Sequence, residues 1–185
     1  MRVSRDVAAK NRRKVVDAAS REFRSNGYDG IGVAGLMKSA GMTHGGFYKQ
    51  FDSKDALIAE ATEQALKQNF DYWERTLHAV GGDPLPTLRD WYLSQDHLNA
   101  RDRGCTFATL AAEAPRHGAP LQDVFTAAVE RQVADLARRL EGEGDADARG
   151  AALRAMAQMI GSMVLARAVS DPDLQDEILN AARNV

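Results

Sequence analysis

The sequence contains one cysteine, Cys105, so the chain cannot form an intramolecular disulfide or a cysteine-rich metal site. No stretch approaches 18 uncharged apolar residues, and the first residues lack the apolar segment of a signal peptide. Strand signals, in which Val, Ile or Thr alternate with polar residues between turns, are also missing. We therefore expect an all-α cytoplasmic protein with no membrane partner.

Signatures of catalysis are equally scarce. The four histidines, His44, His78, His97 and His117, lack metal-ligand spacing with one another or with carboxylates, and there is no phosphate-binding loop or serine elbow. A nucleophilic Cys105 would need a base that the sequence does not identify. These observations predict no enzymatic activity, no metal and no cofactor.

Charge is distributed unevenly along the chain, although the formal net charge is only −2. Residues 1–60 hold 11 Lys and Arg against 7 Asp and Glu, whereas residues 61–185 hold 13 against 19. The basic end is the candidate for contact with nucleic acid. Such an excess also occurs on ordinary solvated surfaces, so it does not decide the question alone.

Apolar residues at helical spacing predict about nine helices, divided by glycine, proline and N-cap signals. We expect them at residues 11–25, 33–40, 43–51, 54–77, 87–98, 105–114, 120–141, 148–169 and 172–183. The first three form a helix-turn-helix domain, residues 1–52. A larger helical domain for ligand binding and dimerisation, residues 53–185, follows.

The segment from Gly41 to Phe51 has the features of a recognition helix, which must be short, exposed and able to approach DNA closely. Gly41 permits a sharp turn, and the next residues include a capping threonine and two glycines. Phe47 and Phe51, four residues apart, are predicted to face inward. The remaining side chains of the segment then point outward.

Residues 12–58 resemble the DNA-binding domain of the TetR family of bacterial regulators. The matching pieces are Asp17-Ala18-Ala19, Phe23, Asn26-Gly27-Tyr28, Ala40-Gly41-Met42-Thr43, Gly45, Phe47-Tyr48, Phe51, Ser53-Lys54 and Leu57. The resemblance implies a homodimeric transcriptional regulator of operator DNA, a repressor released by a small-molecule inducer of unknown identity. The DNA-binding residues it implies are Thr43, His44, Gly45, Gly46, Tyr48 and Lys49, together with Lys54 as a phosphate ligand.

Three positions depart from the family pattern, at Gly32, Met37 and Gln50. Gly32 removes a side-chain cap before the second helix, and Met37 predicts altered packing of that helix on the third. Within the basic segment Arg12-Arg13-Lys14, a DNA backbone partner would explain positive charge at a helix start, although plain surface charge explains it nearly as well. His44 can read a base or lie near a phosphate.

The later helices carry large or soft side chains that are candidates for a ligand pocket, although most such residues are plain core. These pocket candidates are Phe70, Trp73, Trp91, Tyr92, Cys105, Phe107, Phe125, Met159 and Met163. Small residues near the C-terminus would let another helix lie close, and the TetR resemblance implies that the dimer interface lies there, with burial inside the monomer as the alternative. This dimer face comprises Gly161, Ser162, Leu165, Ala166 and Ile178.

Cys105 follows two arginines at the expected start of a short helix, an environment that lowers the pKa of a thiol. This pattern allows a sensor of electrophiles or oxidants, but a packed core cysteine is the favoured interpretation. The competing hypothesis for the whole chain is a helical ligand-binding or thiol-based sensor that does not act through DNA. Acidic residues or loss of the Tyr48-Lys49 pair in the recognition helix would favour it, and neither occurs.

Overall fold

The computed structural model describes residues 5–78 and 83–184, and the regular secondary structure in this part of the chain is all helical, with no strand. Nine α-helices and two 3-10 helices occur in these ranges, which confirms the all-α prediction. In chain order they are α1 (Arg5–Asn26), α2 (Val33–Ser39), η1 (His44–Lys49), α3 (Lys54–His78), α4 (Pro84–Tyr92), α5 (Gln95–Asn99), α6 (Thr106–Leu110), η2 (Ala111–Arg116), α7 (Ala119–Gly142), α8 (Ala148–Ala168) and α9 (Pro172–Arg183).

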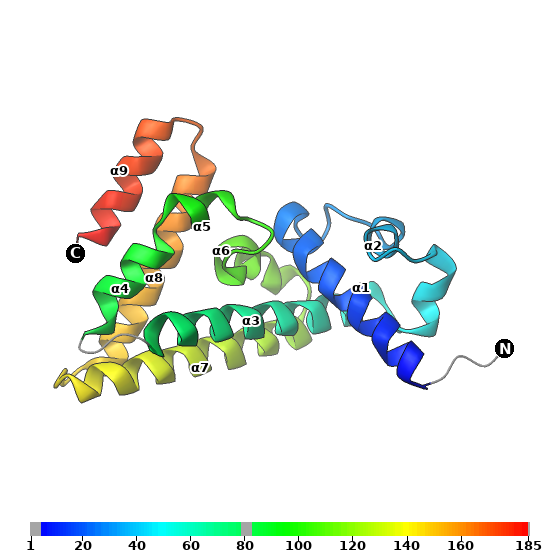
Figure 1. Ribbon diagram of the computed structural model, residues 1–185, viewed down its shortest axis with the longest axis horizontal. Coiled ribbons are helices and arrows are strands. Elements are labelled where there is room, and N and C mark those ends of the chain that lie inside the picture. The colour runs from blue at the N-terminus through cyan, green and yellow to red at the C-terminus, as the bar shows by residue number, and fades with distance from the viewer. Residues whose placement is uncertain (1–4, 79–82, 185) are drawn as a thin grey trace.

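The molecule is elongated, with a small head of α1, α2 and η1 at one end and the remaining helices at the other (Figure 1). The long helix α3 begins in the head and runs along α7 into the larger part, while α8 and α9 pack side by side at the far end. The prediction of a small N-terminal three-helix unit followed by a larger helical region is therefore confirmed at the level of the fold.

One hydrophobic core connects the two parts, because α3 supplies buried residues to both of them. Leu57 and Ile58 pack in the head, and Trp73 and Leu77 pack among the later helices. The Tyr28 hydroxyl, buried at the end of the head, shares a hydrogen bond of 2.8 Å with Thr62 of α3. The two parts are thus joined by a packed helix rather than by a flexible linker.

Several expected helix bounds were wrong. The first helix begins at Arg5, within the described residues, and not at Asn11, so the basic segment 12–14 lies inside a helix. The expected helix 87–98 is two helices, because Ser94 leaves the helical conformation and caps α5 by accepting from the His97 amide. The expected helix 105–114 is α6 followed by the 3-10 helix η2. Pro115 lies inside η2, and its backbone has no N–H to donate to an α-helical hydrogen bond.

The third expected helix, residues 43–51, is a 3-10 helix limited to residues 44–49. Gly45 and Gly46 form its first turn, and each glycine disfavours a regular α-helix by about 1 kcal/mol relative to alanine. A tight 3-10 turn is the common alternative for such a short segment. The helical segment between α2 and α3 is consequently shorter than the sequence predicted.

Candidate functional site

The turn between α2 and η1 has the backbone conformation that the sequence predicted. Gly41 takes a positive φ of 70°, which glycine adopts without steric cost. The Gly41 amide donates to the Lys38 carbonyl at 3.0 Å and the Met42 amide to the Met37 carbonyl at 2.8 Å. These hydrogen bonds fix the direction in which the chain leaves α2, so η1 has a defined position against it.

Buried side chains hold η1 onto the head. Phe47 is fully buried and its ring stacks on Phe51 with centroids 5.5 Å apart. Met37, one of the three departures, is also fully buried, and its methyl group would lie 3.5 Å from a Cβ built on Gly46. The inward direction of both phenylalanines is confirmed, and methionine at this position fills the space beside a glycine.

The outer surface of η1 brings together most of the predicted DNA-contacting residues. Tyr48 leaves 70% of its surface exposed, an unusual amount for a large aromatic side chain. Thr43, His44 and Lys49 are also exposed, and a Cβ on Gly45 would meet nothing within 4 Å. Gly46 differs, since it is half-buried beside Met37. The exposed set is called the η1 face: Thr43, His44, Gly45, Tyr48 and Lys49.

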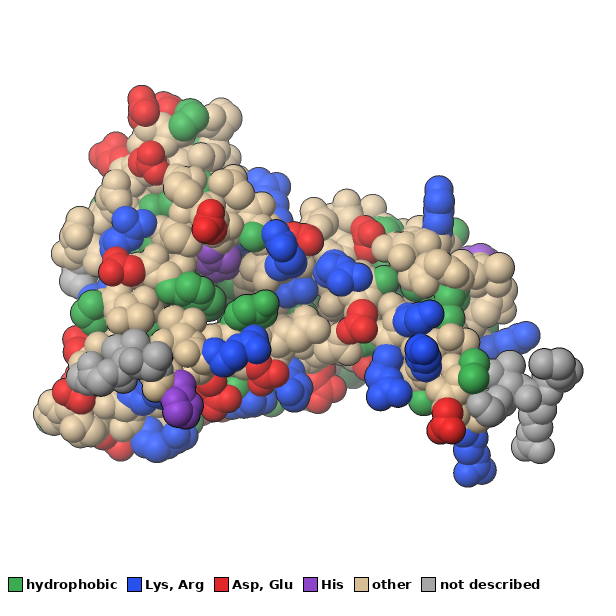
Figure 2. All heavy atoms as spheres, viewed as in Figure 1, with side chains coloured by type: hydrophobic (Ala, Val, Ile, Leu, Met, Phe, Trp, Pro, Cys, Tyr) green, Lys and Arg blue, Asp and Glu red, His purple; other side chains and the backbone are tan. Residues whose placement is uncertain are grey.

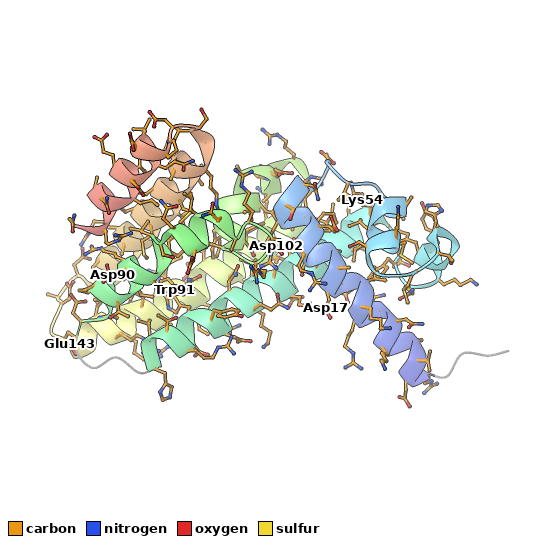
Figure 3. The ribbon with its side chains drawn as sticks, turned by 45° about the horizontal axis from the view of Figure 1, so that its top comes forward. Asp17, Lys54, Asp90, Trp91, Asp102 and Glu143 are labelled. Carbon is orange, nitrogen blue, oxygen red and sulfur yellow. The ribbon has the colours of Figure 1, made fainter. Side chains whose placement is uncertain are left out.

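Lys54 lies at the start of α3 (Figure 3), but its ammonium group has partners within the head. Its Nζ donates to the Tyr28 carbonyl at 2.6 Å and lies 3.9 Å from an Asp29 carboxylate oxygen. The side chain is only 28% exposed. Lys54 therefore anchors α3 to the loop after α1, in addition to any contact with a phosphate.

The basic segment of α1 has internal partners that the sequence reading did not foresee. The Arg12 Nε donates to Glu60 of α3 at 3.0 Å, a second nitrogen donates to the Gln50 carbonyl, and the guanidinium covers the Phe51 ring at 4.2 Å. These contacts account for the position of Arg12 within its own chain, and a DNA backbone partner for the segment Arg12-Arg13-Lys14 stays a prediction. The other Lys and Arg side chains of α1 are exposed, except for the buried Arg24. Basic side chains are visible on this part of the surface in Figure 2.

A cavity of about 270 Å³ lies between α3, α4 and α5 and the loop that follows α5. In Figure 3, Trp91 marks its α4 side and Asp102 marks that loop. A much smaller hollow of about 10 Å³ lies directly behind it, and Trp73, Tyr92, Cys105 and Gln132 line both. The other residues around the larger cavity are Asn69, Tyr72, Trp91, Ser94, Asp96, His97, Ala100, Arg103 and Gly104.

The pocket candidates divide between this cavity and the core. Four of them, Trp73, Trp91, Tyr92 and Cys105, line the larger cavity, while Phe107 and Met159 reach only the small hollow. The other three do not line this cavity, which agrees with the expectation that most candidates are plain core, although Phe70 lines a separate groove. These three are Phe70, Phe125 and Met163.

The orientation of their helices explains why Phe70, Phe125 and Met163 do not line the larger cavity. Phe70 faces a separate groove between α3 and α7, where the Arg131 guanidinium covers its ring at 3.7 Å. Phe125 packs against Phe107 with centroids 5.9 Å apart, and Met163 is fully buried on α8. Residue type alone did not reveal which side of each helix faced the cavity.

His97 is one of the cavity residues that the sequence did not indicate, and it has a defined neutral state. Its Nε2 accepts from the Cys105 amide at 2.9 Å, so its Nδ1 carries the proton and donates to the Tyr92 carbonyl at 2.6 Å. Burial lowers the pKa of His97 to about 4. Its ring lies nearly parallel to Trp91, at 9° with centroids 6.2 Å apart. The spacing of apolar residues in the sequence gives no indication that a polar residue such as His97 lines the cavity.

Cys105 does not have the environment of a reactive thiol. Its side chain is buried, and desolvation raises the pKa of the thiol despite the nearby Arg167. Of the two arginines that were expected to lower it, Arg103 lies against Asp102 and Arg101 donates to the Arg167 carbonyl at 3.5 Å. The expected lowering of this pKa was wrong, and the packed core interpretation fits the structure.

The predicted dimer face is only partly on the surface. Leu165 is 59% exposed and Gly161, Ser162 and Ile178 are half-buried, but Ala166 is fully buried inside its own chain. Ala166 was therefore wrongly included. The sequence reading missed three further exposed apolar side chains on α8 and α9. With Leu165 they form what we call the α8–α9 face: Leu153, Val164, Leu165 and Leu174.

Residues 15–61, which run from the middle of α1 through η1 to the first turns of α3, match the family described as "Bacterial regulatory proteins, tetR family". This segment of the chain therefore matches the TetR family. The resemblance inferred from the sequence is thereby confirmed, and TetR-family proteins are regulators rather than enzymes. In the described residues no three His, Cys, Asp or Glu side chains gather as a metal site would require, and no helix is long and apolar enough to cross a bilayer.

Relatives of known sequence support the same family. An uncharacterized HTH-type transcriptional regulator of Bacillus subtilis, YvdT, is 31% identical over 46% of this chain and 43% of its own length. The HTH-type transcriptional repressor Rv1474c of Mycobacterium tuberculosis is 41% identical over 31% of this chain and 30% of its own. The chain thus spans less than half of the length of the curated relatives it matches.

Solved TetR-family structures share the whole fold. A regulator from Cytophaga hutchinsonii aligns over 100% of this chain and 96% of its own, with a TM-score of 0.83 and 16% identity. A putative regulator from Saccharomonospora viridis, solved in complex with choline, aligns over 95% of each chain with a TM-score of 0.78 and 20% identity. At such identities the likeness establishes the fold alone.

Proposed function

We propose that this TetR-family regulator binds operator DNA as a homodimer through the η1 face and acts as a repressor that a small molecule releases. The observation that carries the proposal is the exposed aromatic and basic surface of η1, held by Phe47 and Phe51 at the only strongly basic end of the sequence. Short helical elements in this position place their side chains at base edges in the major groove.

The proposed dimer uses the α8–α9 face. Leu153, Val164 and Leu165 lie on α8 and Leu174 lies on α9, and each leaves at least 40% of its surface exposed. Clusters of exposed large apolar side chains of this kind mark protein interfaces. A two-fold dimer places two heads on successive turns of the major groove, about 34 Å apart or a multiple of that, and so favours a palindromic operator.

Hydrogen bonds connect the cavity to the head in a way that supports release by a ligand. The Gly104 carbonyl, in the cavity wall, accepts from Asn69 of α3 at 3.0 Å and from Arg24 in the last turn of α1 at 3.3 Å. The Asn69 side-chain oxygen accepts from the amide and hydroxyl of Thr106. A ligand that displaces Gly104 would therefore change hydrogen bonds of both α1 and α3, the helices that connect the cavity to the head.

Selection of bound duplexes from random DNA, followed by gel shifts at fixed salt, tests DNA binding. Tyr48→Ala is expected to weaken binding to the selected duplex by at least about tenfold, the scale of one good base-edge contact. Tyr72→Ala is the matched control, because Tyr72 is 56% exposed but lies on α3, away from η1. Equal affinities of the two variants would contradict the assignment of the η1 face.

Sedimentation velocity tests the dimer separately. Leu165→Lys places a charge on the α8–α9 face and is expected to yield monomers at micromolar concentration, because a lysine ammonium is costly to desolvate in an apolar interface. Tyr72→Lys adds the same charge elsewhere and serves as the control. A dimer that persists in Leu165→Lys would place the interface on another surface.

A further inference from the structure

We propose that a cleft at the junction of the head and the larger part binds a small dianionic oxyanion, such as the phosphate group of a monoester. The cleft has a volume of about 270 Å³ and lies between the last turns of α1 and α8, the helix α6 and the loop after α5. It is separate from the cavity between α3, α4 and α5, because the two have no lining residue in common. A ligand here would contact both the head and the larger part.

Three arginines line the cleft, and among the described residues no carboxylate does. Arg24 belongs to α1, Arg101 to the loop after α5 and Arg167 to α8. None of the three forms an ion pair with a described Asp or Glu side chain. Figure 2 shows basic side chains over this junction. The rest of the lining is uncharged: Ser25, Gly27, Ala108, Thr109, Val164 and Ala168.

Backbone carbonyl groups hold two of the guanidinium groups at the cleft. Arg24 donates from Nε to the Ser20 carbonyl at 3.0 Å and from Nη1 to the Gly104 carbonyl at 3.3 Å. The Arg167 Nη2, which donates to the His97 carbonyl at 2.7 Å, would lie only 2.9 Å from a Cβ built on Gly104. The two arginines therefore converge on Gly104, where the absence of a side chain leaves room for Arg167.

Positive charge at this position is costly without an anion. Arg24 is only 5% exposed, and burial lowers the pKa values of both Arg24 and Arg167. The charge of Arg101 opposes the protonation of Arg167 as well and so lowers its pKa further. Buried charges in proteins are normally paired, because an unpaired ion loses its hydration without compensation. A bound oxyanion supplies that compensation.

The charges near the cleft favour an anion with two negative charges. The carbonyl ends of α1 and α8 are each equivalent to about half a negative charge, so roughly two of the three positive charges remain uncompensated. Two acidic side chains nearby have other partners, since Asp102 lies 3.6 Å from Arg103 and Glu113 accepts from the Tyr28 amide at 2.9 Å. Arg101 is exposed, and its planar guanidinium can donate to two oxygens of one phosphate group.

Competition against radiolabelled inorganic phosphate in equilibrium dialysis of the full-length protein tests the charge of the ligand. Methyl phosphate is mostly a dianion at about pH 7.5, since the second pKa of a phosphate monoester is about 6. Dimethyl phosphate is a monoanion that resembles the DNA backbone. At constant ionic strength we expect one phosphate site per chain with a Kd below about 1 mM, and displacement by methyl phosphate at a concentration at least about tenfold lower than by dimethyl phosphate.

Two variants assign this binding to the cleft. Arg101→Gln removes the exposed guanidinium and is expected to raise the Kd of phosphate at least about tenfold, the scale of a hydrogen bond to a charged group. Arg116→Gln is the matched control and should bind phosphate as the parent protein does. Arg116 is also exposed and also donates to one backbone carbonyl at 3.5 Å, but it does not line the cleft.

Equal potency of methyl phosphate and dimethyl phosphate, no phosphate binding at about 10 mM, or an unchanged Kd in Arg101→Gln would each overturn the inference. The competing partner of the arginines is a carboxylate of a second copy, because Val164 belongs both to the cleft and to the α8–α9 face. A parent protein that binds no phosphate, together with an Arg101→Gln variant that sediments as a monomer, would overturn the inference in favour of that partner. None of the dialysis measurements contains DNA, so their outcome is independent of the proposed operator binding.

Discussion

The neutral, doubly hydrogen-bonded His97 predicts a specific dependence of stability on pH. In the folded protein its pKa is lowered to about 4, whereas an unfolded chain has the ordinary value near 6.5. Because the unfolded state binds the proton more readily, His97 contributes full stability above pH 6.5. That contribution declines as the pH falls from 6.5 toward 4.

The magnitude follows from the two pKa values. Between pH 7.5 and 5.5 the unfolded chain gains most of one proton at this residue and the folded protein gains almost none, which lowers the free energy of unfolding by about 1.3 kcal/mol. Protonation in the folded state would also remove the acceptor for the Cys105 amide and leave that N–H unpaired. The cost of the charged form therefore has an identified structural origin.

Urea unfolding at pH 7.5 and 5.5 measures this contribution in the parent protein and in His97→Gln. Glutamine retains hydrogen-bonding groups but does not titrate, so the variant should lose about 1.3 kcal/mol less than the parent between the two pH values, whatever its absolute stability. His44→Gln, at an exposed histidine, is the control and should lose as much as the parent. An identical pH dependence in His97→Gln and the parent protein would refute the reasoning.

Three further predictions concern the head and the thiol. Lys54→Ala should weaken binding to all DNA sequences alike and lower the salt slope of the affinity by about one charge. Because Nζ donates to the Tyr28 carbonyl, it should also lower the free energy of unfolding by about 1 kcal/mol. An unchanged salt dependence would remove Lys54 from the DNA interface. Phe47→Ala should cost about 3–5 kcal/mol in thermal unfolding, since the ring is fully buried, and a loss below about 1 kcal/mol would contradict that packing. Cys105 should react with a maleimide at least about tenfold more slowly in the folded than in the unfolded protein. Mild oxidants should change the operator affinity of Cys105→Ser no differently from that of the parent protein.

The sequence predicted the parts of the fold that local chemistry determines. Gly41 permits a left-handed turn, and Phe47 and Phe51 lie on one side of their segment, so these two features could be predicted from residue type and spacing. The length of η1 was misjudged because two consecutive glycines replace an α-helical turn with a 3-10 turn. The break at Ser94 was missed because its capping role depends on the following backbone geometry.

The cavity was only half predictable. Large aromatic residues indicated Trp73, Trp91 and Tyr92 correctly, but the same criterion selected Phe125, which packs in the core. His97 could not be found, since its role depends on two backbone partners eight and five residues away that meet it only after the chain turns. Periodicity describes which residues share one helix side, but not which side meets which neighbour.

The shared helix α3 has a consequence for anyone who wishes to isolate or exchange the DNA-contacting head. The core of the head includes Leu57, Ile58 and Ala61, and within the described part of the chain the buried hydroxyl of Tyr28 shares its hydrogen bond with Thr62. A fragment that ends at residue 52 would expose the apolar side of α1 to water and strand that hydroxyl. A chimera that grafts this head onto another regulator should therefore place its junction beyond Thr62, several turns inside α3.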